Sequence, residues 1–101
     1  MSAFRFALAA HEDLAEVLDF VEQASSTSRA EQFLDDILRA GQLLAEHPRL
    51  GHLRRDLTPL PVRFWPVHSI LLVYRPDTSP LEIVRVLSGW RDVSRLLEDL
   101  G

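Results

Sequence analysis

Residues 61–92 (PVRFWPVHSILLVYRPDTSPLEIVRVLSGWRD) constrain the fold of this chain more than any other stretch. They contain three short runs of β-branched, aromatic and aliphatic residues, the composition typical of strands, at 62–65, 70–74 and 81–87. Pro66, which cannot donate a hydrogen bond to a neighbouring strand, ends the first run. His68–Ser69 and the turn formers of Pro76–Pro80 separate the runs. The stretch therefore predicts three consecutive strands.

The third of these runs carries a charged residue among apolar ones. Strand alternation places Arg85 on the same face as Ile83 and Leu87. A guanidinium in such a strand needs a partner, because burying an unpaired charge is costly. The partner is either a structural carboxylate, for which Asp56 and Asp92 are the candidates, or a bound ligand. The sequence leaves both alternatives open.

The N-terminal half predicts one strand and two helices. Residues 3–8 alternate in the way of a short strand. Glu12–Asp13 then suit the N-terminus of a first helix, which ends near residues 25–27. Ser28 and Glu31 have the spacing of a capping box for a second helix, and Pro48 ends that helix. Because few residues join the two helices, we expect an antiparallel hairpin over one face of the sheet.

The remaining segments complete an α+β fold. Residues 49–58 form a polar loop in which Gly51 should absorb a sharp turn, and residues 91–100 have the spacing of a short terminal helix. The expected order is β-α-α-β-β-β-α, with the helical hairpin packed on a small, mainly antiparallel sheet. A chain of 101 residues is long enough for one such domain, so residues 1–101 are expected to be a single unit.

Composition excludes several kinds of site. The chain has no cysteine, and its four histidines lack metal-ligand spacing, so we expect neither a metal nor a cofactor. The longest apolar run, Ile70–Tyr74, is far shorter than the roughly 20 residues that span a bilayer. We expect a cytoplasmic protein without a membrane partner.

Charge is divided unevenly along the chain. Residues 1–48 carry a net charge of −6 and residues 49–101 a net charge of +2, and every basic residue is arginine. The overall charge of −4 argues against broad electrostatic binding to nucleic acid. Arginine is suited to carboxylates and phosphates, so the C-terminal half is the better candidate for contact with an anionic partner.

These elements and motifs together resemble the ParE/RelE superfamily of small bacterial toxins from toxin–antitoxin operons. The resemblance covers nearly the whole chain and depends on the order and spacing of several motifs. These are A-x-x-F-L…L-x-x-H-P-x-x-G from Ala30 to Gly51, then R-R-D-L from Arg54, V-R-F-W-P-V leading to V-Y-R-P, and E-I-V-R-V-L-S-G-W-R-D.

The resemblance implies one of two activities. RelE-like members cut messenger RNA on the ribosome, using arginines against the phosphate charge and a proton-transferring residue near the C-terminus. ParE-like members inhibit DNA gyrase and need no catalytic constellation. Arg63 and Arg85 match the strand arginines of the superfamily and could converge on one face of the sheet. However, Ser88 stands where relatives often have histidine, and serine is a poor proton carrier at neutral pH.

We therefore expect a ParE-like gyrase inhibitor with no catalytic residue. The alternatives are a RelE-like mRNA interferase and a decayed toxin that only binds its antitoxin. The resemblance implies a ParD-like ribbon-helix-helix antitoxin in a heterotetramer or larger complex. Its acidic, amphipathic C-terminal segment is expected to add to an exposed sheet edge or to lie in the groove beside the helical hairpin. Tyr74 and Trp65 are expected in the core or lining a groove. The candidate contacts with antitoxin or target are Arg63, Trp65, Tyr74, Arg85, Trp90, Arg91 and Arg95, of which Trp90, Arg91 and Arg95 would meet gyrase.

Overall fold

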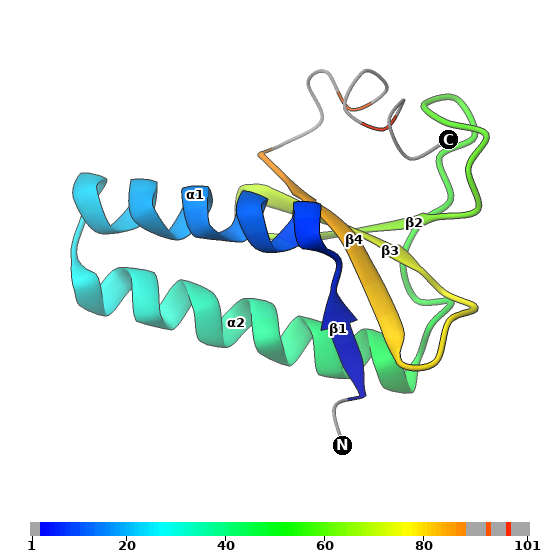
Figure 1. Ribbon diagram of the computed structural model, residues 1–101, viewed down its shortest axis with the longest axis horizontal. Coiled ribbons are helices and arrows are strands. Elements are labelled where there is room, and N and C mark those ends of the chain that lie inside the picture. The colour runs from blue at the N-terminus through cyan, green and yellow to red at the C-terminus, as the bar shows by residue number, and fades with distance from the viewer. Residues whose placement is uncertain (1–2, 89–92, 94–96, 98–101) are drawn as a thin grey trace.

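The computed structural model describes residues 3–88 together with residues 93 and 97. The elements follow the order β1 (Phe4–Phe6), α1 (Leu8–Ala24), α2 (Thr27–Glu46), β2 (Arg63–Val67), β3 (Ile70–Arg75) and β4 (Leu81–Leu87) (Figure 1). This order and the α+β architecture agree with the sequence prediction. The helix expected at 91–100 falls outside the described residues, apart from Val93 and Leu97.

The four strands form one mixed sheet in the order β1-β4-β3-β2. β2 pairs antiparallel with β3 and β3 with β4, whereas β1 pairs parallel with β4. The predominance of antiparallel pairing was predicted from the sequence. β2 runs through Pro66 to Val67 instead of ending before it. An edge strand tolerates proline, because its outer side needs no backbone donor.

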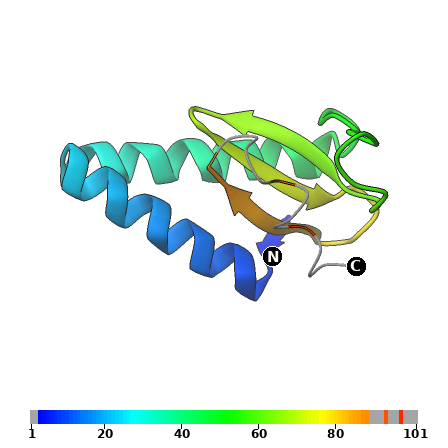
Figure 2. The ribbon, with the colours of Figure 1, turned by 90° about the horizontal axis from the view of Figure 1, so that it is seen from above.

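The two helices form a hairpin on one side of the sheet (Figures 1 and 2). α1 begins at Leu8, earlier than the Glu12–Asp13 pair suggested, since the alanines that follow Leu8 favour helix. α2 is capped by Ser26, whose Oγ accepts a hydrogen bond from the Arg29 amide at 3.0 Å. The capping box predicted at Ser28 is therefore wrong by two residues. Among the described residues, no helix is long and apolar enough to cross a membrane.

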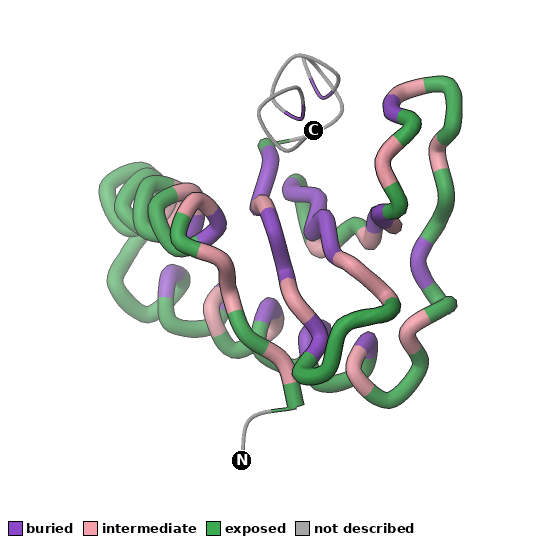
Figure 3. The backbone as a smooth tube through the Cα atoms, turned by 45° about the vertical axis from the view of Figure 1, so that its right-hand side comes forward, coloured by how far each residue is buried: buried purple, intermediate pink, exposed green. Residues whose placement is uncertain are grey.

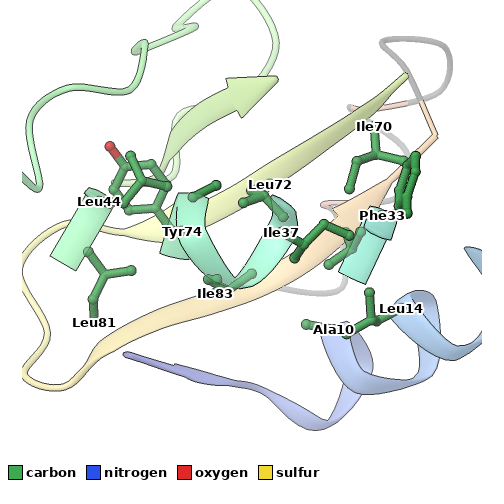
Figure 4. Close-up of a cluster of buried hydrophobic side chains, with 12 residues drawn as sticks. Ala10, Leu14, Phe33, Ile37, Leu44, Ile70, Leu72, Tyr74, Leu81 and Ile83 are labelled. Carbon is green, nitrogen blue, oxygen red and sulfur yellow. The ribbon is translucent and has the colours of Figure 1, made fainter. Parts of the chain in front are cut away.

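The sheet separates two apolar clusters. The first cluster lies between the sheet and the helical hairpin (Figure 4); its buried residues include Leu14, Phe33, Ile37, Leu72, Tyr74 and Ile83. The second lies on the opposite face of the sheet, where Val93 and Leu97 join Phe64 and Val73. Both helices therefore cover the same face, as expected. Their remaining surface is largely exposed (Figure 3).

Candidate functional site

Arg85 is held by Asp13 of α1. Its Nε and Nη2 donate to the two carboxylate oxygens at 2.7 and 2.9 Å, and each side chain is only 16% exposed. The carboxylate also accepts the Val86 amide at 3.0 Å. Pairing between β1 and β4 stops at Ile83, so Asp13 takes the place that the next residue of a longer β1 would fill. One side chain thus joins helix and sheet.

The partner of Arg85 was predicted incorrectly. Asp56 instead pairs with Arg54, at 2.9 and 2.7 Å, and Asp92 lies outside the described residues. Asp13 was missed because it was assigned to a helix N-terminus. With the helix beginning at Leu8, Asp13 falls between Ala10 and Leu14 on the buried stripe of α1. A carboxylate within an apolar helix stripe was the signal that could have identified it.

Tyr74 and Arg63 hold the loop that follows α2. The Tyr74 hydroxyl donates to the Pro48 carbonyl at 2.7 Å and accepts the Gly51 amide at 2.8 Å. Arg63 Nη1 donates to the carbonyl groups of Arg49, at 3.2 Å, and Gly51, at 2.8 Å. Tyr74 has no exposed surface, and burial raises the pKa of its hydroxyl. These contacts fix residues 48–51 against the sheet.

Gly51 is required for this arrangement because of space. A Cβ atom at this position would lie 2.5 Å from the Tyr74 hydroxyl oxygen. The chain bends at Gly51, as expected from the sequence, but the backbone of Gly51 is not in the left-handed region. The close approach to Tyr74, not an unusual backbone conformation, is therefore what requires glycine here. The glycine lets the loop meet the tyrosine.

The two strand arginines do not converge. Arg63 lies opposite Tyr74 across the β2–β3 ladder, whereas Arg85 lies opposite Val73 across the β3–β4 ladder. Arg63 contacts the loop after α2 and Arg85 contacts α1, so the expected meeting of the two guanidinium groups is not observed. Register and partner choice together keep them apart.

The other predicted contacts divide between described and undescribed residues. Trp65 is half-buried against the first cluster and lies parallel to His52, with ring centroids 6.5 Å apart. It therefore lies where the sequence placed it, in the core or lining a groove. Trp90, Arg91 and Arg95 fall outside the described residues. Within residues 3–88, 93 and 97, no group of three His, Asp or Glu side chains could hold a metal ion.

An open groove adjoins the loop fixed by Tyr74 and Arg63. It has a volume of 550 Å³ and is lined by residues 46–50, Pro76 and Asp77. Leu50 (41% exposed) and Leu53 (44% exposed) present apolar surface on the same loop. Arg49 and Asp77 lie 3.9 Å apart and are both highly exposed, so they contribute little rigidity. The arrangement is suited to holding a peptide from another protein.

Comparison with known proteins identifies the family. The sequence profile of the ParE toxin of the type II toxin–antitoxin system, parDE, matches residues 4–93. No curated protein matches the sequence. A solved structure described as the chromosomal ParDE TA system from P. aeruginosa superimposes with a TM-score of 0.72, covering 89% of this chain and 98% of that chain. At 18% identity, this similarity establishes the fold alone. The chain belongs to the ParE toxin family of type II toxin–antitoxin systems.

Proposed function

We propose that this protein acts in the bacterial cytoplasm as a toxin that inhibits DNA gyrase until an antitoxin of the ParD type neutralises it. The observation that carries the proposal is the engagement of both strand arginines in internal contacts. Cleavage of RNA requires cations directed at the developing charge on phosphorus. Arg85 directs its guanidinium at Asp13 instead, and Arg63 directs Nη1 at two carbonyl groups.

The antitoxin is proposed to lay an acidic segment along the β2 side of the sheet. Arg63 and Trp65, both half-buried on β2, are the proposed direct contacts there. Tyr74 and Arg85 are proposed to act indirectly, by holding the surrounding structure in place. Tyr74 fixes the loop at residues 48–51, and Arg85 fixes α1 to the sheet. Contact with gyrase is assigned to Trp90, Arg91 and Arg95, beyond the end of β4.

Pulse labelling after controlled expression separates the two activities of the superfamily. We expect thymidine incorporation to fall before methionine incorporation, and the purified protein to block supercoiling by gyrase in vitro. Reversing the charge of Arg91 and Arg95 should abolish both effects, while the same reversal at Arg29 and Arg39 on α2 should not. An earlier fall in methionine incorporation would favour the RNA-cleaving alternative. If neither thymidine nor methionine incorporation falls, the protein acts only as an antitoxin-binding module.

A further inference from the structure

The helical hairpin has a second groove, far from the loop at residues 48–51. It has a volume of 370 Å³ and runs between α1 and α2. Four residues of each helix line it: Ala15, Leu18, Asp19 and Glu22 of α1, and Thr27, Ala30, Glu31 and Leu34 of α2. The functional proposal above makes no use of this groove.

The groove follows the helix axes. On each helix, its lining residues recur at i, i+3, i+4 and i+7, so each set forms a straight stripe of about two turns, or roughly 10 Å. On α2 the stripe continues with Leu38, which lies one turn beyond Leu34 and is 40% exposed. Half of the groove lining (Ala15, Leu18, Ala30 and Leu34) forms an apolar strip beside charged residues, and such a strip is suited to an amphipathic partner.

The rim of the groove is acidic. Asp19, Glu22 and Glu31 line it, and no lining residue is basic. Among the described residues, Glu22 and Glu31 form no ion pair, and Asp19 accepts a hydrogen bond only from Gln23, at 3.2 Å. Residues 8–46 as a whole carry nine carboxylates and two arginines, a net charge of −7. The groove therefore repels an acidic segment and attracts a basic one.

We propose that this groove binds a short basic amphipathic helix presented by a partner protein. Apolar side chains of that helix would pack on Leu18 and Leu34, with the two alanines allowing close approach. Its lysines or arginines would flank the strip and meet Asp19, Glu22 and Glu31. Backbone groups between two helices are already hydrogen-bonded, so the groove offers no edge for an added strand. This surface is distinct from the sheet edge assigned to the acidic segment.

A designed peptide tests the proposal directly. It has about 14 residues, roughly four helical turns, with leucine and alanine at i, i+3, i+4 and i+7 and lysines on both flanks. Fluorescence anisotropy is followed as the labelled peptide is titrated with the full chain. We expect saturable binding, and we expect Glu22→Lys/Glu31→Lys to weaken it about tenfold or more, because attraction becomes repulsion.

A matched variant distinguishes the groove from the general negative charge of the hairpin. Glu16→Lys/Asp35→Lys makes the same change in net charge, with one substitution on each helix, outside the groove lining. It should leave binding within about threefold of the unmodified protein. Equal weakening by both variants, no binding of the peptide, or equal binding of a peptide with glutamate in place of lysine would each overturn the proposal. The measurement does not depend on gyrase inhibition, so the two proposals fail separately.

Discussion

Replacing Asp13 with alanine should destabilise this protein more than any substitution of an exposed carboxylate. The change removes two hydrogen bonds to Arg85, at 2.7 and 2.9 Å, and one to the Val86 amide, at 3.0 Å. Removing one partner of a buried ion pair costs about 3–5 kcal/mol, and an unsatisfied backbone amide costs about 1–3 kcal/mol. Each side chain keeps 16% exposure, which admits some water. We expect a loss of about 3 kcal/mol in the free energy of unfolding.

Urea denaturation followed by circular dichroism measures this loss, with an unchanged dependence on urea showing that two-state unfolding is retained. The control is Asp56→Ala. Asp56 makes a bidentate pair with Arg54 at 2.9 and 2.7 Å, the same geometry as the Asp13 pair, but is itself 62% exposed. Its replacement should not shift the midpoint measurably. Equal shifts for both variants would refute the reasoning, because geometry without burial would then account for the effect.

Three further predictions concern contacts that hold loops and turns in place. Tyr74→Phe removes the hydroxyl that contacts both ends of the 48–51 loop, at Pro48 and Gly51. The change should lower the free energy of unfolding by about 1–3 kcal/mol. Because burial raises the pKa of Tyr74 from its ordinary value of 10.0, its contribution is complete below that pH. It is lost as the pH rises through the folded-state pKa, so only the tyrosine protein should show this loss; parallel alkaline curves would contradict it. Gly51→Ala places a Cβ atom 2.5 Å from the same hydroxyl and should destabilise by about 1–3 kcal/mol, whereas an unchanged melting temperature would argue against the close approach. His68→Ala removes the contact of 2.7 Å with Asp36 and should lower the melting temperature. Asp36→Asn alone keeps a hydrogen-bonding side chain opposite His68, so it should lower the melting temperature less than His68→Ala does; an equal fall would show that charge carries the contact.

The sequence predicted most of the local structure correctly. Runs of β-branched and aromatic residues identified β2, β3 and β4, and apolar periodicity identified both helices. Such patterns are reliable because they depend on residues that are neighbours in the chain. The boundaries were less certain: α1 begins at Leu8 instead of near Glu12, and α2 is capped by Ser26 instead of Ser28. Several residues at each boundary can serve as a cap, and packing decides among them.

The candidate site was predicted only as a set of residue types. The sequence showed that Arg85 needs a partner, and it offered carboxylates near β2 and beyond β4. The partner is Asp13, which is 72 residues away along the chain. Tyr74 was expected in the core or lining a groove, and it is buried, but its hydrogen bonds to the loop at residues 48–51 had no sequence signal. Long-range contacts of this kind follow from how elements pack.

What the sequence determined by itself is the order of elements, the α+β class and the toxin family, because each depends on local periodicity or on motif spacing. The tertiary structure decided which groups meet. It placed Asp13 against the part of β4 that extends beyond β1, separated Arg63 from Arg85, and brought Gly51 into contact with Tyr74. It also aligned two helix stripes into one acidic groove. The physical reason is that a buried polar group without a hydrogen-bond partner is costly, so most such groups are paired. Which partner is within reach depends on the packed arrangement of helices and sheet.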